Sequence, residues 1–254
     1  MTDERERILR RAPVLRGCRD EPRSRRELET ITDKSRATVY RATTELEEEE
    51  LLERTDDGYR TTPKGAALSH AAEAFRDDIE AIDRLEPLFD RIDHPELLAR
   101  VHLLSDAEVT VADGDNMYRA NDRVLECWAE TETVRSAMAG SGSRLCLEKS
   151  VSMAVEREMD VEMCFRPDVL PSDEHLDTGD FDASTMFEQF ETYLSESVPF
   201  TFLLCDDFAV IAAHNETGIP VVVAETEDPA VYQWLESSYE RIKEDARPLE
   251  PVLA

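Results

Sequence analysis

The sequence predicts a small α+β domain at the N-terminus, a connecting helix, and a larger α/β domain whose mixed sheet is covered by helices. Three observations predict this organisation. Helix-capping signals and an Asp-Gly turn lie close together in residues 1–64. An apolar stripe at helical spacing follows in residues 65–94, and strand-like and helical stretches alternate over residues 95–254. We therefore expect the domain boundaries at these positions.

The composition indicates a folded protein with an acidic surface. The 254 residues include 58 Asp and Glu against 29 Lys and Arg, for a net charge of -29, and the 41% that are hydrophobic recur along the whole chain. Only four of the cations are lysines. Acidity with few lysines is typical of salt-adapted organisms, in which concentrated salt screens the self-repulsion, although a GC-rich genome also favours Arg over Lys.

The N-terminal quarter of the chain lacks this excess of acidic residues. Residues 5–41 carry twelve Lys and Arg against six Asp and Glu, so a polyanion can approach this end and is repelled from the other. An ordinary salt-bridged surface would give the same count. Charge alone does not decide between the two interpretations.

Cysteine usage and the N-terminal segment indicate a cytoplasmic protein without metal or cofactor. The five cysteines are odd in number and contain no Cys-x-x-Cys pair, which favours reduced thiols over a disulfide framework or a zinc site. The charged first residues lack the apolar core of a signal peptide. No apolar run approaches the roughly 20 residues of a membrane span, so we expect no membrane partner.

Two helices are predicted before residue 33. Apolar residues between Ile8 and Cys18 favour a first helix or helix pair, in which Pro13 is acceptable only in a first turn. Ser24 and Glu27 have the spacing of a capping box. A short second helix should therefore run from residue 25 to about residue 30.

A third helix should begin after Ser35, which can cap it, and end near Glu49. Val39, Ala42 and Leu46 recur at steps of three and four and give it one buried face. The residues that then point outward are Arg36, Ala37, Tyr40, Arg41 and Thr44. Two helices joined by a tight turn, the second presenting such residues from its first turns, make a helix-turn-helix whose second helix enters the DNA major groove.

A hairpin should follow directly. Residues 51–55 and 59–62 are strand-like, and the Asp-Gly pair between them is a strong hairpin signal. A hairpin in this position is the wing of a winged helix-turn-helix, and it would bring Arg54 and Arg60 near the phosphate backbone. We expect the acidic block of residues 47–50, at the far end of the third helix, to face away from DNA.

At this point the sequence resembles a known family. Residues 35–41, 46–48, 51–59 and 62–65 look like the winged helix of archaeal, especially haloarchaeal, transcription regulators. The family usually has glycine where this chain has Glu50, so the end of the third helix departs from the pattern. Residues 109–116, Tyr118 with Arg119, and the apolar strands after Pro199 resemble the effector domain of the methanogenesis-regulator type.

The expected partner of this N-terminal domain is double-stranded DNA. The candidates for base-edge contact are Arg36, Ala37, Thr38 and Tyr40, the candidates for phosphate contact are Arg41, Arg54 and Arg60, and Ser35 and Thr44 complete the candidate surface. The alternative is a winged-helix protein-interaction adaptor without sequence-specific DNA binding.

The connecting helix has a stripe that suits a partner helix. Leu68, Ala72, Phe75, Ile79 and Ile82 alternate at steps of four and three before Pro87 intervenes. Both a coiled-coil dimer seam and a helix lying on its own chain fit this pattern. We expect a homodimer, because two recognition helices read half-sites one DNA turn apart.

The larger domain should form a mixed sheet. The expected strands are residues 109–112, 144–147, 161–165, 200–205, 208–213 and 219–224, and the expected helices are 121–139, 151–158, 185–193 and 229–242. Short turns make the last three strands antiparallel, and their unbroken apolar runs indicate that both faces of the sheet are covered.

No catalytic constellation is recognisable, and we expect no enzyme. The five histidines are scattered, none forms His-x-Lys or a metal-binding pair, and there is no phosphate loop or Gly-x-Ser-x-Gly elbow. An enzyme with a fused DNA-binding module is therefore the least favoured interpretation. A pocket for a small anionic metabolite is the remaining role, with candidates Asp113, Asp115, Asn116, Tyr118, Arg119, Arg144 and Arg166. Ion pairing is the alternative role for these arginines.

Overall fold

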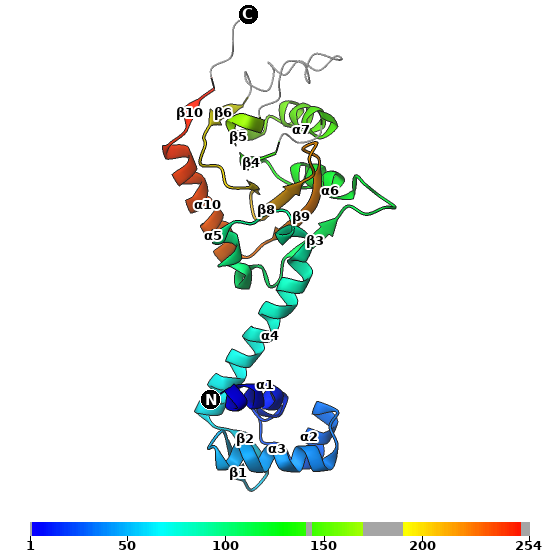
Figure 1. Ribbon diagram of the computed structural model, residues 1–254, viewed down its shortest axis with the longest axis vertical. Helices are drawn as coiled ribbons and strands as arrows, with labels where there is room; N and C mark the ends of the chain where they lie inside the picture. The colour runs from blue at the N-terminus through cyan, green and yellow to red at the C-terminus, as the bar shows by residue number, and fades with distance from the viewer. Residues whose placement is uncertain (1, 141–143, 170–189, 250–254) are drawn as a thin grey trace, which may run out of the picture. The chain divides into compact units, whose positions relative to one another are not determined.

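The computed structural model describes residues 2–140, 144–169 and 190–249, and the chain divides into two compact units, Met1–Ile79 and Glu80–Ala254 (Figure 1). Helix α4 (Pro63–Phe89) begins in the first unit and ends in the second. Among the described residues, no helix combines the length and the apolar character needed to cross a membrane.

The first unit contains three helices and a hairpin in the predicted order. Helix α1 spans Thr2–Gly17, α2 spans Arg25–Thr32 and α3 spans Arg36–Glu48, and they are followed by strands β1 (Leu52–Thr55) and β2 (Gly58–Thr61). The expectation for Pro13 is wrong, because this residue lies inside α1. Val14 and Leu15 beside it are fully buried, so packing of the helix outweighs the lost hydrogen bond.

Both predicted caps are present. The Ser24 hydroxyl accepts from the backbone N–H of Glu27, and the Ser24 backbone N–H donates to the Glu27 carboxylate at 2.8 Å. The hydrogen bonds that the Ser24 backbone N–H and hydroxyl donate to this carboxylate lower the pKa of the Glu27 carboxyl. The Ser35 hydroxyl accepts from the backbone N–H of Thr38 at 3.3 Å. Each cap satisfies backbone donors that a helix start otherwise leaves without partners.

Helix α3 ends through a left-handed residue that is not glycine. Glu50 has φ 58°, its N–H donates to the Glu47 carbonyl at 3.1 Å, and the Leu51 N–H donates to the Leu46 carbonyl at 2.9 Å. This pair of bonds is a Schellman motif, for which glycine is the usual residue. Helix α3 therefore ends in this motif with a glutamate in the strained position.

The hairpin has a two-residue turn and a third short partner. Leu52 pairs with Thr61 and Thr55 with Gly58, which leaves Asp56 and Asp57 as the turn. The backbones of Arg23 and Tyr59 exchange two hydrogen bonds of 2.9 Å, which ties the segment before α2 to β2. A Cβ on Gly58 would lie 2.5 Å from the Arg23 carbonyl, so this close approach requires glycine.

One apolar core holds the first unit together. It contains residues from all three helices and both strands: Val14, Leu15, Cys18, Leu28, Val39, Ala42, Leu46, Leu51, Leu52 and Tyr59. The first turn of α4 packs directly on this core. A Cβ on Gly65 would lie 2.1 Å from the Leu51 carbonyl oxygen, so only glycine fits there.

The second unit is built on an eight-stranded mixed sheet in the order β10-β6-β5-β4-β7-β8-β9-β3. The strands are β3 (Glu108–Val111), β4 (Thr133–Met138), β5 (Asp160–Phe165), β6 (Glu191–Leu194), β7 (Thr201–Leu204), β8 (Ala209–His214), β9 (Pro220–Thr226) and β10 (Arg247–Pro248). Strands β4, β5 and β6 run parallel, and the other pairs are antiparallel. The predicted antiparallel order of the last three long strands is confirmed.

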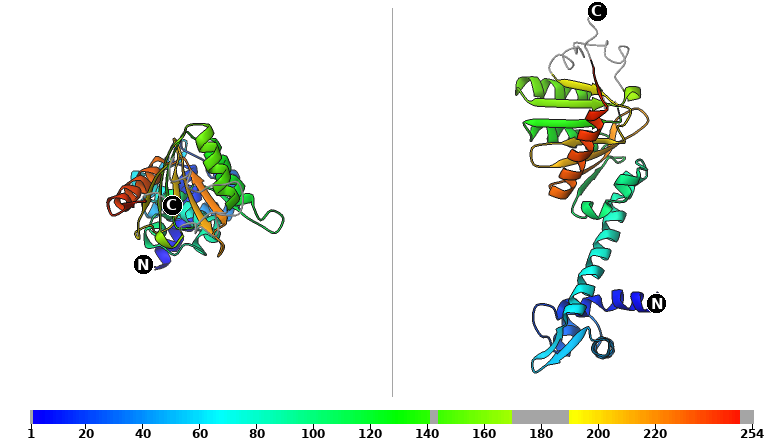
Figure 2. Two further views of the ribbon diagram at one scale, coloured as in Figure 1. Left: turned by 90° about the horizontal axis from the view of Figure 1, so that it is seen from above. Right: turned by 90° about the vertical axis from the view of Figure 1, so that its left-hand side faces the viewer.

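Helices cover both faces of this sheet. Helices α6 (Arg119–Ala129) and α7 (Arg144–Glu156) pack on one face, and α10 (Pro229–Glu244), with the end of α4 and the short α5 (Pro95–Leu98), packs on the other (Figure 2). Two 3₁₀ turns complete the unit, Val101–Leu104 and Pro167–Val169. Strand β7 is buried at every position, which confirms the prediction that both faces are covered.

Three predicted elements are wrong. The helix expected over residues 121–139 ends at Ala129, and β4 follows, because the Asp206 carboxylate accepts from the backbone N–H groups of Glu132 and Thr133 and stops the helix. The strand expected over residues 144–147 is the first turn of α7, whose buried Cys146, Ser150 and Ala154 recur every four residues.

The third wrong element lies at β6. A helix was expected over residues 185–193, but residues 191–194 pair in parallel with β5, where the strand completes the hydrogen bonds of its neighbour. Residues 185–189 lie outside the described part of the chain. The connecting helix also continues through Pro87 to Phe89, because Leu85 and Leu88 are fully buried in the core of the second unit.

The strained end of α3 gives a stability prediction. Glu50→Gly should raise the free energy of unfolding by about 1 kcal/mol, because glycine adopts a positive φ without the steric cost of a side chain. Urea unfolding at constant salt measures it. The matched control, Glu47→Gly, removes the same charge from inside α3 and should lower the free energy of unfolding by about 1 kcal/mol. Equal effects from the two variants would contradict this account.

Candidate functional site

The exposed face of α3 begins at its first residue. Arg36, Ala37, Tyr40 and Arg41 are exposed, and Tyr40 retains 57% of its accessible surface. On the opposite side Val39, Ala42 and Leu46 lie in the core, as the spacing predicts. The structure therefore brings four of the predicted DNA-contact residues onto one exposed face.

The hydroxyl groups predicted for the same surface already have partners. The Ser35 and Thr38 hydroxyls lie 2.9 Å apart in the cap, and the Thr44 hydroxyl donates to the Tyr40 carbonyl at 2.9 Å. These side chains are engaged in holding the helix, and any DNA contact from them remains a prediction.

Arg25 is a candidate site residue that the sequence analysis missed. Its guanidinium carbon lies 4.2 Å from the ring centroid of Tyr40 and 5.1 Å from that of Tyr59, and its Nε donates to the Thr43 hydroxyl at 2.8 Å. Stacking on two rings and one hydrogen bond hold Tyr40 in a defined position. These partners come from α3 and β2, and no local sequence pattern predicts such a contact.

Ion pairs neutralise some arginines of the first unit and leave others unpaired. Two arginines of α1, and Arg19 just after this helix, pair with acids: Arg11 lies 2.6 Å from Glu45, Arg7 pairs with Glu49, and Arg19 lies 2.9 Å from Glu73. By contrast, Arg26, Arg36, Arg41, Arg54 and Arg60 have no ion pair within the described residues. These five arginines lie on α2, α3 and the hairpin.

The acidic block at the end of α3 is divided between two environments. Glu49 turns toward Arg7 of α1. Glu47 and Glu48 are exposed and follow Tyr40 and Arg41 by seven residues, which is two helical turns, so they lie on the same face further along α3. A polyanion is attracted to the N-terminal half of this face and repelled by the other half.

The two hairpin arginines lie on opposite faces of the hairpin. Arg54 is directly opposite Tyr59 and shares its face, whereas Arg60 is opposite Glu53 on the other face. Both arginines are exposed. Because the ring of Tyr59 lies beside Arg25, Arg54 is on the hairpin face that continues the α3 surface.

In the second unit, five of the predicted ligand residues form one exposed loop before α6. The Asp113 carboxylate accepts from the backbone N–H groups of Asp115 and Asn116, each at 2.9 Å, and these bonds lower the pKa of Asp113. The Asn116 side chain accepts from the Tyr118 N–H at 3.0 Å, and Arg119 lies 3.8 Å from Asp113. The loop satisfies its own polar groups.

The other two predicted residues lie elsewhere. Arg166 forms an ion pair with Asp168 at 2.6 Å and donates to the Ala139 carbonyl at 3.2 Å, so it links the ends of β4 and β5. Arg144 begins α7, and its side chain lies outside the described part of the chain. The structure does not bring Arg166 to the loop, and a ligand role for both arginines stays a prediction.

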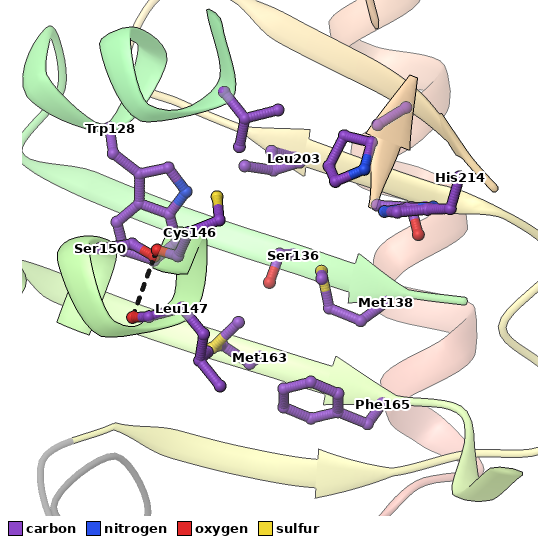
Figure 3. Close-up of a pocket in the computed structure, with 14 residues that line it drawn as sticks. Trp128, Ser136, Met138, Cys146, Leu147, Ser150, Met163, Phe165, Leu203 and His214 are labelled. Carbon is purple, nitrogen blue, oxygen red and sulfur yellow. Dashed lines mark hydrogen bonds between the residues drawn. The ribbon is translucent and has the colours of Figure 1, made fainter. Parts of the chain in front are cut away.

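An apolar cavity that the sequence analysis missed lies between the sheet and helices α6 and α7 (Figure 3). Its volume is about 40 Å³, and it is lined by Val124, Trp128, Ser136, Met138, Cys146, Leu147, Ser150, Met163, Phe165, Thr201, Leu203, Ala212, His214 and Pro220. Among the predicted ligand residues whose side chains the structure describes, none is part of this lining. In the sequence, the small residue Ser136 between Val134 and Met138 could have indicated a gap in the packing. The side chains around that gap become known only when the strands are paired.

A bidentate ion pair fixes one wall of this region. Arg123 of α6 donates to both carboxylate oxygens of Glu225 on β9, at 2.7 and 2.6 Å, which clamps α6 onto the sheet. These carboxylate contacts raise the pKa of Arg123 further above its usual range. Within the described residues, no group of three or more His, Cys, Asp or Glu side chains is placed to hold a metal ion.

The chain matches two protein-family models. Residues 117–245, just over half of the chain, match the middle domain of the methanogenesis regulatory protein FilR1, and residues 3–84 match the HVO_A0261 N-terminal domain. The chain belongs to the family defined by that FilR1 middle domain. No curated protein sequence matches the chain.

Solved structures resemble the chain at low sequence identity. TrmBL2, described as an archaeal chromatin protein with a novel mode of DNA binding, is 14% identical with a TM-score of 0.43, over 95% of this chain and 94% of its own. NucT from Helicobacter pylori is 11% identical, and the phospholipase D family member Nuc from Salmonella typhimurium is 12% identical. Each of these two has a TM-score of 0.42, over 57% of this chain and 99% of its own.

Thiol chemistry gives a prediction for both units. None of the five cysteines forms a disulfide and all five are buried, and burial raises the pKa of Cys18, Cys127 and Cys146 to about 12. We expect a disulfide reagent such as dithionitrobenzoate to label the native protein at least about 100-fold more slowly than the unfolded chain, because only a thiolate reacts. Absorbance of the released thiolate measures the rate, and fast labelling of any native thiol would contradict the assignment.

The same shifts fix the direction of the pH dependence. Unfolded thiols ionise near pH 8.5, whereas the buried ones stay protonated well above that pH. Their contribution to stability is therefore complete below about pH 8.5 and is lost as the pH rises toward the native values. Urea unfolding at pH 7.5 and pH 9.5 should show the lower free energy of unfolding at the higher pH.

Proposed function

We propose that this chain is a DNA-binding transcription regulator whose first unit is a winged helix-turn-helix. One observation carries the proposal: the first two turns of α3 present Arg36, Tyr40 and Arg41 without ion pairs, while acids nearby are paired with α1. Membership of a family named for a methanogenesis regulatory protein supports a regulatory role. A DNA partner also agrees with the cytoplasmic location expected from the sequence.

Helix α3 has the features needed to enter a major groove by its N-terminus. The positive end of the helix dipole and the arginines at its start favour a phosphate-lined groove. Arg36 can donate two parallel hydrogen bonds to a guanine edge, and Tyr40, held by Arg25, offers a ring and a hydroxyl beside it. The exposed Glu47 and Glu48 oppose entry of the other half, so the helix has one approach end.

The hairpin supplies contacts to the DNA backbone. Arg54 lies on the face that continues the α3 surface and is the stronger candidate for a phosphate contact, whereas Arg60 lies on the outer face opposite Glu53. The acids of the turn, Asp56 and Asp57, limit how closely the tip can approach a phosphate. We infer a halophilic archaeal source from the acidic surface, since high salt screens repulsion between this chain and DNA.

A second copy of the chain is the occupant that we propose for a groove between α1 and α4 within the first unit. This groove has a volume of about 330 Å³ and includes Leu9, Phe75 and Ile79, which are 41%, 51% and 43% exposed. Because the patch contains both projecting side chains and a hollow, two identical patches can fill each other around a twofold axis. The resulting homodimer would present two recognition helices to two half-sites.

The α3 face gives the principal test of DNA binding. Arg36→Ala and Arg41→Ala should each weaken operator binding by about 1–3 kcal/mol while the protein stays folded, because each removes a base or phosphate contact. A mobility-shift titration on the promoter region beside the chain's own gene measures the affinity, and circular dichroism checks the fold. Arg91→Ala is the matched control, since it removes an exposed arginine from the second unit and should leave binding unchanged.

Salt and sequence dependence separate the two candidate functions. Arg54→Ala should reduce the slope of log affinity against log salt by about 0.9, as expected for one lost phosphate contact. A scrambled duplex of the same length should bind at least about 1000-fold more weakly than the operator. A protein-interaction adaptor instead predicts equal binding to both duplexes, and that result would refute the regulator assignment.

The dimer proposal is tested on α4. Phe75→Glu should convert a dimer to a monomer, because it places a charge in the groove that the second copy fills. Sedimentation equilibrium measures the mass. Ala74→Glu introduces the same charge at an exposed position on the other side of the helix and should leave the dimer intact. A monomeric parent protein, or equal dissociation by both variants, would count against this interface.

A further inference from the structure

We propose that the cavity beneath α6 and α7 binds a small, uncharged, largely apolar molecule with one hydroxyl or carbonyl group, and that this molecule is the regulator's effector. Binding to the cavity stands on the geometry of the second unit alone. Only the effector role rests on the proposed function.

The walls of the cavity exclude a charged ligand. Strands β4, β5, β7 and β8 form one side, with Met163, Leu203 and Ala212, and helices α6 and α7 form the other, with Trp128 and Leu147 (Figure 3). No Asp, Glu, Lys or Arg side chain is among the described residues that line it. A carboxylate or phosphate would lose its hydration there without gaining a partner, so the site suits a neutral molecule.

Ser136 is the polar group that lacks a partner. It is fully buried on β4, it lines the cavity, and its hydroxyl has no hydrogen-bond partner within the described structure. Buried polar groups in native proteins nearly always have one. Ser150 lines the same cavity but donates its hydroxyl to the Cys146 carbonyl, so its need is already met. The unmet hydroxyl of Ser136 therefore marks where a ligand's oxygen binds.

His214 lies at another part of the wall and keeps the site neutral. A Cβ on Gly140 would come within 2.6 Å of the His214 ring, so the ring lies directly against the backbone after β4. Burial lowers the pKa of His214 to about 4, which leaves the imidazole uncharged at neutral pH. A neutral imidazole can donate or accept one hydrogen bond, which suits a hydroxyl or carbonyl ligand.

The volume bounds the size of the ligand. An engineered apolar cavity of about 150 Å³ binds benzene, and the cavity here is near 40 Å³, so its resting shape accepts only a few heavy atoms. Met138 and Met163 line it, and their unbranched side chains can change rotamer to admit more. Suitable probes for the resting shape are therefore 1-butanol and 2-butanone, and phenol is the larger probe that requires Met138 and Met163 to change rotamer.

The experiment uses the full-length protein labelled with carbon-13 at the methionine methyl groups. Titration with 1-butanol, 2-butanone or phenol should shift the Met138 and Met163 signals to saturation and leave that of Met117, which is 65% exposed and outside the cavity, unchanged. Butyrate, of similar size to butanol but charged, should produce no shift. The site is overturned if no probe shifts these two signals, or if butyrate shifts them equally.

Three variants locate the binding site. Ser136→Ala should weaken phenol and 1-butanol binding three- to tenfold, because it removes one hydrogen bond. Ser150→Ala, the matched control, should leave these affinities within twofold. Ala212→Leu should abolish binding by filling the cavity. If Ala212→Leu does not fold, the serine pair still decides, and equal affinities for Ser136→Ala and Ser150→Ala would overturn the role of Ser136.

The effector role has its own readout. The mobility-shift titration is repeated with phenol at ten times its dissociation constant, and an operator affinity that changes at least fivefold supports the effector role. Methyl shifts without a change in operator affinity would overturn that role and leave the binding site standing. Methyl shifts in a protein that binds no operator under either condition would overturn the proposed DNA-binding function and again leave the site standing.

Discussion

The ion pairs between α1 and the second half of α3 are the contacts on which the character of the first unit depends. Without Arg7 and Arg11, the acids Glu49 and Glu45 would add their charge to α3 and oppose that of Arg36 and Arg41. Such pairs contribute little to stability when exposed. Their importance is in the distribution of charge. They neutralise the acids on the side of α3 that faces α1, and the exposed side stays positive at the start of the helix.

Much of the first unit could be predicted because its signals are local. Capping residues, helical spacing and the Asp-Gly pair act within four residues of each other, so the three helices and the hairpin follow from the sequence. The turn itself consists of Asp56 and Asp57, and Gly58 begins β2. The contacts of Arg25 with Tyr40 and Tyr59 could not be predicted, since they join three elements that only the fold brings together. The position of Glu47 and Glu48 on the same face as Tyr40 and Arg41 could have been predicted from helical periodicity alone.

In the second unit, the pairing of strands that are distant in sequence determines the secondary structure where local sequence signals are ambiguous. Residues 133–138 carry no strong signal against a helix, and they form a strand because β5 and β7 lie on either side and satisfy their backbone. The cavity escaped prediction for the same reason: Ser136, Cys146 and Ala212 come from three distant segments. The polar and charged residues of the loop from Asp113 to Arg119, which suggested a ligand site in the sequence, are exposed and form hydrogen bonds and an ion pair with one another.

The missing side chain at Gly65 has a mechanical consequence. With the start of α4 in direct contact with the Leu51 carbonyl, the hairpin and the beginning of this helix form one rigid body that cannot slide without breaking its packing. A displacement of the first turn of α4 would therefore move Leu51 and β1 with it, and so Arg54, because no side chain or gap lies between the two backbones to absorb the movement.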